Sequence, residues 1–461
     1  MPYFPHTEGD REAMLRAIGV ETTEDLFRGI PGAIRLRRPL RIPARRSEAE
    51  ILAELHALAS RNRRMDDRPS FLGAGVYRRF IPAALDYLSS RGEFNTSYTP
   101  YQPEVSQGTL QAIFEYQSLI CRLTGMEISN ASMYDAATAL AEAVLMAHAV
   151  KGHGTRVLVS EGIHPEYRRV LATYLKNHPV EIEVLPLEDG VTSPRSLEAA
   201  LREDTLAFAF QTPNFFGSIE DGRAIEKVLG ARGADARPLL IAVANPIALG
   251  VLEPPGRQGA DIVVGDGQQL GNYPSYGGPT FGFFATRMAH VRKVPGRIVG
   301  ETRDVDGKRG YVLTFQTREQ HIRRERATSN ICTNQGLCSL RGAMYLSFLG
   351  ETGLREVATV SARRAHGAFA RLTAIPGIEK VWDAPFLDEF PLRLPVPAEE
   401  AYRFLEQRGI GGGLPLVRYF PERDDQMLFA FTEMATPKDV DALVGALEEV
   451  GVGAPRPAEA P

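Results

Sequence analysis

Polar residues that could bind a small ligand follow several short apolar runs of this chain. Four such polar segments stand directly after an apolar run: Glu161–Pro165, Thr212–Gly217, Asn245–Pro246 and Asp266–Gln269. In an open parallel sheet, ligands bind beyond the carboxyl ends of the strands. The pattern therefore predicts a ligand crevice at one edge of a sheet, although loops are polar for other reasons too. His164 can stack on a planar ligand there or simply cap the next helix.

A loop before the first of these runs has the residue types of a polar binding site. Ser97–Gly108 carries two tyrosines, two glutamines and three hydroxyl side chains on a chain stiffened by proline. Neutral hydrogen-bonding groups beside aromatic rings suit a small polar substrate. The alternative is an ordered loop that caps a helix starting near Thr109.

Two later segments are weaker candidates. In Tyr276–Gly282, adjacent glycines let backbone N–H groups approach an anion closely, but Gly-Gly-Pro is also an ordinary turn. In Arg318–Gln335, arginines and a histidine precede a run of hydroxyl and amide side chains. That segment is either the polar wall of a site or the salt-bridged start of a helix.

The elements that must position these residues alternate between strand and helix. Six short apolar or β-branched runs are predicted strands: Arg156–Ser160, Glu181–Leu185, Leu206–Gln211, Leu239–Ala244, Asp261–Gly265 and Phe281–Ala285. Helical periodicity before and between them predicts an α/β fold with a mostly parallel, doubly covered sheet. We expect a helical arm over residues 1–70, the large α/β domain over 71–335, a small α+β domain over 336–453 and a Pro/Ala-rich tail over 454–461.

Composition excludes several classes of function. The 461 residues carry a net charge of -4, which leaves no basic excess to neutralise nucleic-acid phosphates. No apolar run is long enough to span a bilayer, and the first residues lack a targeting pattern, which predicts a cytoplasmic protein without membrane contact. The three cysteines form no CxxC pair, so neither a disulfide framework nor a metal site is expected.

Four strings together resemble the P-protein family of the glycine cleavage system. They are Tyr98–Gly108, Asn130–Ala139, Gln211–Asn214 and Arg324–Asn334. The resemblance covers nearly the whole chain, and the length is similar to that of the separate N-terminal subunit of two-subunit P-proteins. It implies a fold type I (aspartate-aminotransferase-like) pyridoxal-phosphate enzyme, whose sheet has one antiparallel strand. It also implies glycine decarboxylation on that cofactor, with transfer of the aminomethyl group to the lipoyl arm of H-protein.

Two residues that the cofactor needs in this class are missing. A strand-end aspartate normally pairs with the pyridine nitrogen, and a lysine normally forms the imine. The matching positions here hold Ala242 and Gln269, or Gln268 if the register shifts by one. The chain has seven lysines, and the nearest to this position is Lys293. An amide nitrogen cannot form an imine, and Asp135 stands where a helix would otherwise bind the phosphate dianion.

The resemblance therefore implies a division of labour. A lysine-bearing second subunit (the β subunit) carries the pyridoxal phosphate, in an α2β2 heterotetramer, and this chain completes the active site from across the interface. The candidate lining residues are Tyr98, Thr99, Tyr101, Gln102, Ser106, Gln107, Thr328, Ser329 and Asn330. The candidates for the cofactor phosphate in trans are Gly277, Gly278 and Thr280. The partners expected are the second subunit, lipoylated H-protein and glycine.

Two other interpretations remain. One is an active pyridoxal-phosphate enzyme of another kind, such as a cysteine desulfurase or an aromatic decarboxylase, which the missing lysine disfavours. The other is a non-catalytic scaffold or regulator with the same fold. The density of ligand-type groups in Tyr98–Gln107 disfavours the scaffold, because a scaffold does not require them.

Overall fold

The computed structural model describes residues 5–453, and the predicted tail over 454–461 lies outside them. The chain divides into two units, residues 1–63 and 64–461. The first unit contains α1 (Glu8–Ile18), a short 3₁₀ helix (Thr23–Phe27) and α2 (Glu48–Ala59). Capping boxes at Thr7 and Ser47 define where the two α-helices start. Thr22–Asp25 and Ser47–Glu50 both have the sequence pattern that predicts a helix start; the start at Ser47 is confirmed, whereas only a 3₁₀ turn follows Thr22.

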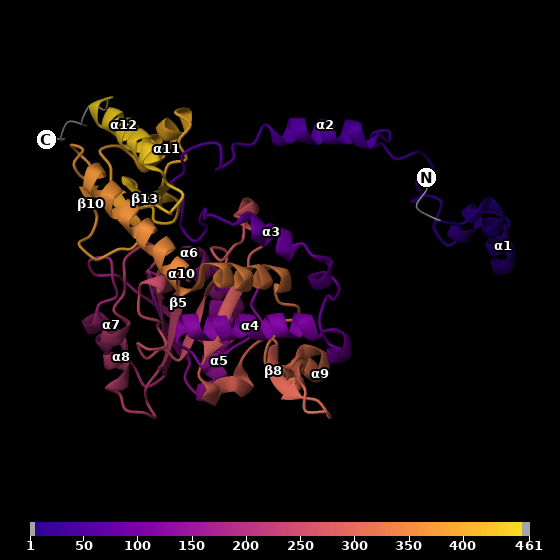
Figure 1. Ribbon diagram of the computed structural model, residues 1–461, viewed down its shortest axis with the longest axis horizontal. Coiled ribbons are helices and arrows are strands. Elements are labelled where there is room, and N and C mark those ends of the chain that lie inside the picture. Colours follow the sequence, from indigo (N-terminus) through magenta and orange to yellow (C-terminus); the bar gives the residue numbers. More distant parts are fainter. Residues whose placement is uncertain (1–4, 454–461) are drawn as a thin grey trace. The chain divides into compact units, whose positions relative to one another are not determined.

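A seven-stranded sheet forms the centre of the second unit (Figure 1). Its order is β1-β7-β6-β5-β4-β2-β3, and only β7 runs antiparallel to its neighbours. The strands are β1 (Ile128–Ser129), β2 (Arg156–Ser160), β3 (Glu181–Leu185), β4 (Thr205–Thr212), β5 (Leu239–Ala244), β6 (Ile262–Asp266) and β7 (Gly282–Thr286). The predicted mixed sheet is confirmed, and so are its six predicted strands, to within one residue at each end.

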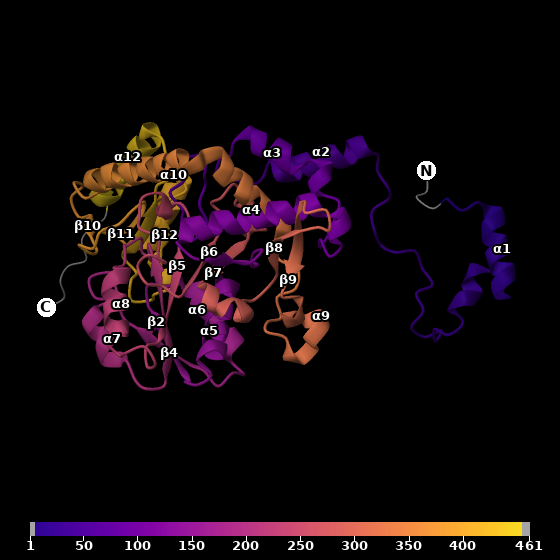
Figure 2. The ribbon, with the colours of Figure 1, turned by 60° about the horizontal axis from the view of Figure 1, so that its bottom comes forward.

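A core cluster covers each face of this sheet, and successive side chains of a strand point to opposite clusters. In β5, for example, Ile241 and Val243 join one core cluster, and Ala242 and Ala244 join the other. Figure 2 shows the layers, with α10 and α4 on one side and α5 and α6 on the other. The helices are α3 (Ala83–Ser89), α4 (Gln107–Thr124), α5 (Ala136–Lys151), α6 (Pro165–Leu175), α7 (Pro194–Ala200) and α8 (Gly222–Gly230).

The long helix α10 (Gly336–Leu372) connects the central sheet with a second core. The sequence predicts two helical stretches here, Leu337–Phe348 and Leu354–Leu372, and the structure confirms the break between them: the backbone is non-helical at Gly350, where φ is 58°. The second core packs α10, α11 (Ala398–Gln407) and α12 (Pro437–Gly453) on a four-stranded antiparallel sheet of order β10-β11-β13-β12. Its strands are β10 (Glu379–Lys380), β11 (Glu389–Arg393), β12 (Leu414–Pro415) and β13 (Gln426–Ala430).

A hairpin that the sequence analysis did not predict packs beside α4. It consists of β8 (Ile298–Arg303) and β9 (Arg309–Thr314), and the short helix α9 (Gln320–Arg323) follows it. Val299, Tyr311 and Leu313 bury against Leu110 of α4. Among residues 5–453, no helix is both long and apolar enough to cross a bilayer.

Gly217 shows how closely the two cores approach each other. It has φ of 85°, and a Cβ atom there would lie 1.8 Å from the carbonyl oxygen of Glu389 in β11. Gly233 has nearly the same φ, 79°, but a Cβ atom would meet nothing within 4 Å.

We expect Gly217→Ala to lower the free energy of unfolding much more than Gly233→Ala. Left-handed backbone strain costs about 1 kcal/mol at either site, and overpacking adds about 1–3 kcal/mol at Gly217 alone. Denaturant unfolding of the purified chain measures both values. Equal losses of unfolding free energy in the two variants would mean that the two cores can move apart at Gly217 without an energetic cost.

Candidate functional site

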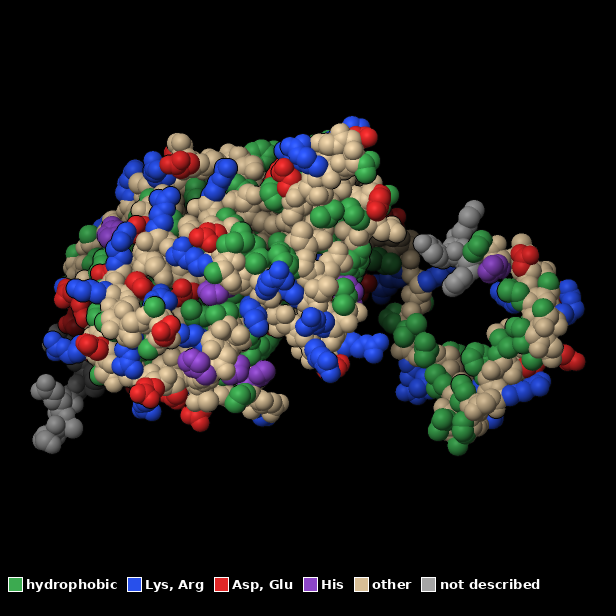
Figure 3. Space-filling model, turned by 90° about the horizontal axis from the view of Figure 1, so that it is seen from below, with side chains coloured by type: hydrophobic (Ala, Val, Ile, Leu, Met, Phe, Trp, Pro, Cys, Tyr) green, Lys and Arg blue, Asp and Glu red, His purple; other side chains and the backbone are tan. Residues whose placement is uncertain are grey.

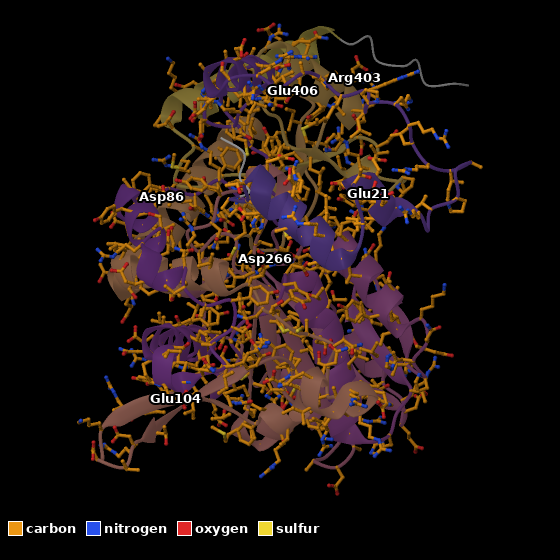
Figure 4. The ribbon with its side chains drawn as sticks, turned by 90° about the vertical axis from the view of Figure 1, so that its right-hand side faces the viewer. Glu21, Asp86, Glu104, Asp266, Arg403 and Glu406 are labelled. Carbon is orange, nitrogen blue, oxygen red and sulfur yellow. The ribbon has the colours of Figure 1, made fainter. Side chains whose placement is uncertain are left out.

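The strand-end loops predicted to form a crevice do meet at the carboxyl ends of β4, β5 and β6. Gln211, Asn214, Asn245, Asp266 and Gln269 line a common cavity of about 40 Å³. Asp266 lies in the middle of the body formed by residues 64–453 (Figure 4). A cavity of this size holds at most a water molecule or two, so the crevice exists but has almost no free volume.

The chain itself fills this crevice with the segment Gly73–Phe80. The backbone of Tyr77 pairs with the side chain of Gln268: Tyr77 N–H donates to Oε1 at 2.9 Å, and Nε2 donates to the Tyr77 carbonyl at 3.0 Å. The Tyr77 hydroxyl donates to Glu389 Oε2 at 2.7 Å, and the N–H of Ala74 donates to Oε1 at 2.7 Å. Gly75 and Tyr77 of this segment therefore line the cavity together with the strand-end residues.

His164 holds the same segment from the other side. Its Nδ1 accepts from the N–H of Glu166 at the start of α6, and its Nε2 lies 2.9 Å from the carbonyl oxygen of Ala74. Burial lowers the pKa of His164, so the ring is neutral and donates to Ala74 from Nε2. Its ring stacks on Tyr167 with centroids 4.7 Å apart. Of the two roles open to His164, the structure shows the helix cap.

Gln269, at the position of the missing lysine, is fixed by a buried guanidinium. Its Oε1 accepts from Arg79 Nε at 2.9 Å and from Arg79 NH2 at 2.7 Å, and its Nε2 donates to Asn245 at 3.0 Å. The remaining Arg79 donors reach Ser361, Asp388 and Glu433, all within 2.9 Å. The amide is therefore integrated into a network that leaves no room for an imine-forming amine.

Carboxylates occupy the start of α5, where this fold usually binds a phosphate. Asp135 caps the helix by accepting from Thr138 N–H at 2.7 Å, and Asp266 accepts from Ala136 N–H at 3.3 Å. Asp266 also accepts from the Thr280 hydroxyl at 2.6 Å. The helix N-terminus attracts anions, and here that role is taken by the chain's own acids.

Burial perturbs two carboxyl groups of this crevice. It raises the pKa of Asp266 to about 6, against hydrogen bonds from Thr280, Gln268 and Ala136 that favour the ionised form. It raises the pKa of Glu389 to about 8, against hydrogen bonds from Ala74 and Tyr77. A phosphate dianion beside Asp266 would face desolvation, and repulsion once that acid is ionised.

These residues therefore do not fit a covalently bound pyridoxal phosphate. The amine is absent at Gln269, the volume is far below that of the cofactor, and the phosphate position holds carboxylates. Ala242, in the aspartate position, is fully buried in the core and offers no charge to a pyridine nitrogen.

A second, larger depression lies where segments distant in the sequence meet. It has a volume of about 540 Å³ and joins Tyr98 and Thr99 to Pro279 and to Thr333–Leu340. The Tyr98 hydroxyl donates to Thr333 Oγ1 at 3.2 Å, and the ring is 90% exposed. Two of the predicted lining residues therefore sit on a surface cavity, beside residues that the sequence analysis did not select.

The other predicted residues have diverse surroundings. Tyr101 is half-exposed, and its hydroxyl accepts from Arg297 at 2.8 Å. Gln107 bonds three backbone groups, at Pro103 and Tyr311, and so holds the β8–β9 hairpin. Gln102, Thr328 and Asn330 are exposed, Ser329 is half-buried and Ser106 is buried. Gly277 and Gly278 both have positive φ, in a turn where Tyr276 is 94% exposed.

The sequence analysis missed the residues that close the crevice: Tyr77, Arg79, Asp388, Glu389 and Glu433. Arg78 and Arg79 are adjacent in the sequence and look like part of a solvated basic stretch. No local pattern distinguishes the buried arginine from its neighbour. The only sequence signal for a buried Arg79 is the uncharged stretch Gly73–Tyr77 before it, which consists of glycine and apolar or aromatic residues, and this signal is weak.

The sheet order, the single antiparallel strand and the strand-end crevice define a fold type I pyridoxal-phosphate-dependent enzyme class. A glutamate decarboxylase from Lactobacillus brevis, 13% identical, shares this fold with a TM-score of 0.66 over 92% of this chain and 98% of that one. The family model described as "Glycine cleavage system P-protein" matches residues 1–447. The chain therefore belongs to the glycine cleavage system P-protein family.

Individual relatives agree over the full length. A probable glycine dehydrogenase (decarboxylating) subunit 1 from Moorella thermoacetica is 47% identical over 98% of this chain and 100% of its own. A protein of the same name from Thermomicrobium roseum is 48% identical over 97% of this chain and 99% of its own. A crystal structure of glycine decarboxylase (P-protein) of the glycine cleavage system, in inhibitor-bound form, matches with 48% identity and a TM-score of 0.88, over 98% of this chain and 100% of that one.

Restoring the lysine alone is expected to fail. Gln269→Lys places an ammonium against the Arg79 guanidinium in a buried site, and an uncompensated buried charge costs about 3–5 kcal/mol. We expect a lower free energy of unfolding than in the exposed control Gln407→Lys. We also expect no imine absorbance when pyridoxal phosphate is added. A borohydride-reducible imine on the introduced lysine would show that the crevice opens readily.

The raised pKa of Glu389 predicts a pH dependence of stability. Its ordinary value is 4.5 and its folded value is about 8, so the folded protein favours the protonated form. That contribution is complete below pH 4.5 and is lost as the pH rises toward 8, with a slope of at most about 1.4 kcal/mol per pH unit.

Glu389→Gln is therefore expected to flatten the fall in the free energy of unfolding between about pH 5 and pH 8. Exposed Glu356→Gln serves as the control and should keep the wild-type slope. Denaturant titrations at several pH values measure it. An unchanged slope in Glu389→Gln would assign the dependence to other groups.

Proposed function

We propose that this chain is subunit 1 of a two-subunit glycine decarboxylase, the P-protein of a glycine cleavage system. With its partner it decarboxylates glycine and passes the aminomethyl group to the lipoyl arm of H-protein. Membership of the P-protein family supports this, together with full-length similarity to chains named subunit 1.

The pyridoxal phosphate belongs to the second subunit in this proposal. The observation that carries this assignment is the hydrogen-bond network around Gln269. Its side-chain oxygen accepts from Arg79 and its side-chain nitrogen donates to Asn245, and the cavity that it lines has a volume of only about 40 Å³. A chain whose own crevice is filled by Gly73–Phe80 has no room for the cofactor. Two copies of each chain, as α2β2, form the assembly that we expect.

In this proposal the chain contributes to catalysis through the surface around the depression that Tyr98 and Thr99 line. Tyr98 and Thr99 stand beside the 540 Å³ depression, with apolar walls from Phe94, Ile113 and Leu340. An exposed phenol at the mouth of an apolar depression suits contact with a partner's substrate or with a lipoyl arm, which is aliphatic with a small polar end. The remaining predicted residues, including Gln102, Thr328, Asn330, Gly277 and Gly278, are proposed to extend this surface.

The alternative of a non-catalytic scaffold makes a different prediction about Tyr98. A scaffold needs the fold and the interface, but the hydroxyl group of an exposed tyrosine would be dispensable. The same complex can therefore distinguish the two functions.

We expect Tyr98→Ala to lower the rate of glycine–bicarbonate exchange about tenfold or more in the complex with the lysine-bearing subunit and H-protein, a loss of about 1.4 kcal/mol or more in transition-state stabilisation. Tyr98→Phe separates the hydroxyl contribution from that of the ring. Tyr87→Ala, an exposed tyrosine on α3, is the control. Full activity of Tyr98→Ala in a stably assembled complex would support the scaffold.

The isolated chain provides a second test. We expect that it binds no pyridoxal phosphate that borohydride can trap, whereas the assembled complex does so on the second subunit. Peptide mapping of the reduced complex locates the modified lysine. A modified lysine in this chain would contradict the assignment.

A further inference from the structure

The depression that Tyr98 and Thr99 line has an uncharged wall. Its described lining residues are aromatic, aliphatic, hydroxyl-bearing, amide-bearing or small, and none of them is an acid, a lysine, an arginine or a histidine. Charged residues make up 24% of the chain, and Figure 3 shows them spread over one face of residues 64–453. A charged ligand that entered the depression would lose its hydration without gaining an ion pair from this wall.

Two hydroxyl groups on this wall are buried and have no hydrogen-bond partner within residues 5–453. They are Tyr116 Oη, on α4, and Ser97 Oγ, on the loop that precedes it. Tyr116 is only 1% exposed, and its ring packs edge-on against Phe281 with centroids 5.8 Å apart. Buried polar groups in folded proteins normally have a partner. The ring of Tyr116 is therefore held in the core while its hydroxyl remains unpaired.

Neighbouring polar groups on the same wall are paired within the chain. The Ser339 hydroxyl donates to the carbonyl oxygen of Gly336 at 3.0 Å. The Asn334 amide donates to the carbonyl oxygen of Ala131 at 3.1 Å and to Ser132 Oγ at 3.0 Å. The two unpaired hydroxyls are therefore exceptions on a wall whose other polar groups find partners.

These features define the chemistry of a ligand that fits. Burial raises the pKa of Tyr116 well above its ordinary value of 10.0, so the hydroxyl stays protonated and can donate a hydrogen bond. Phe94, Ile113 and Leu340 add apolar wall, which favours a ligand with an aliphatic body. The ligand that satisfies this wall is neutral and mostly apolar, and it carries a hydrogen-bond acceptor such as a carbonyl oxygen.

The two substrates of the proposed reaction differ in these properties. Glycine is a very small zwitterion, and the depression offers no cation for its carboxylate and no anion for its ammonium group among the described lining residues. The volume of about 540 Å³ lies in the range of sites for much larger ligands. A lipoyl arm is uncharged, with aliphatic chain, an amide carbonyl and a terminal disulfide ring. The wall therefore matches the lipoyl arm and not glycine.

We propose that this depression binds the lipoyl arm of H-protein and excludes glycine, and that Tyr116 donates a hydrogen bond to the amide carbonyl of the arm. Ser97 is the second hydroxyl that the bound arm satisfies, and the aliphatic part of the arm lies along Phe94, Ile113 and Leu340. This inference rests on the proposed function, because it takes lipoylated H-protein as a substrate of the complex.

Tyr116→Phe separates ligand binding from folding. In the complex of this chain with the lysine-bearing subunit, we expect the variant to bind free lipoamide about three- to tenfold more weakly than wild type, the effect of one lost neutral hydrogen bond. Isothermal titration calorimetry with lipoamide measures this change. The free energy of unfolding of the isolated chain should not fall, because the deleted hydroxyl has no partner there. Tyr273→Phe, which deletes a hydroxyl bonded to Asp86, is the control and should bind lipoamide like wild type.

Ala112→Leu tests the volume of the depression with every hydroxyl group in place. Ala112 lies on α4 and lines the depression, and leucine is also a strong helix former. The larger side chain should narrow the depression and weaken lipoamide binding by a similar factor. In glycine–bicarbonate exchange, both Ala112→Leu and Tyr116→Phe should raise the KM for lipoylated H-protein and leave the KM for glycine unchanged.

Several results would overturn this proposal. Absent lipoamide binding in the wild-type complex, or unchanged affinity in Tyr116→Phe, would leave the hydroxyl to a buried water. A raised KM for glycine alone would assign the depression to glycine. Weaker association of the two subunits in Tyr116→Phe would assign it to a segment of the second subunit, and a lower free energy of unfolding would make the hydroxyl structural.

Exchange activity separates this inference from the proposed function. If the wild-type complex catalyses glycine–bicarbonate exchange and Tyr116→Phe binds lipoamide normally, only the assignment of the depression fails. If the assembled wild-type complex has no exchange activity with glycine and lipoylated H-protein, the proposed function fails.

Discussion

The buried guanidinium of Arg79 is the interaction on which the rest of the crevice depends. A charge in the interior must find partners for all its donors, and Arg79 makes five hydrogen bonds to Gln269, Ser361, Asp388 and Glu433. Burial alone lowers the pKa of Arg79, but the carboxylates of Asp388 and Glu433 outweigh it and raise the pKa. The network joins a strand-end loop, α10 and the loops beside β11 and β13, so removing one partner leaves a charge unpaired.

This network also underlies the proposal that the second subunit carries the pyridoxal phosphate. Glu389 completes the closure from β11, because it accepts from Ala74 and Tyr77 and holds Gly73–Phe80 in the crevice. The polar groups that a ligand would otherwise satisfy are satisfied internally. The crevice thus joins the two cores of residues 64–453, and in the proposed function contact with other molecules is assigned to the exposed residues around Tyr98.

The sequence predicted the strands of the central sheet well, but it did not predict the β8–β9 hairpin or the position of Gly73–Phe80. The strands β2, β3 and β5 begin and end at the predicted residues. For β2 and β5 the reason is that an apolar run buried on both faces has few alternatives. The β8–β9 hairpin was missed because Gly300–Arg303 is polar, and its partner in the core is α4. Gly73–Phe80 was missed because its conformation is fixed by Gln268 and Glu389, which lie about two and three hundred residues away.

The sequence by itself determined which chemistry is absent and which family the strings resemble. Gln269 and Ala242 cannot supply an amine or a carboxylate in any conformation, and Tyr98–Gly108 keeps its composition whatever its neighbours are. Only the tertiary structure decided that the crevice is closed, that Arg79 is buried while Arg78 is not, and that Tyr98 meets Thr333. The physical reason is range: periodicity and side-chain chemistry are local, whereas burial and hydrogen-bond partnership are set by contacts between segments far apart in the chain.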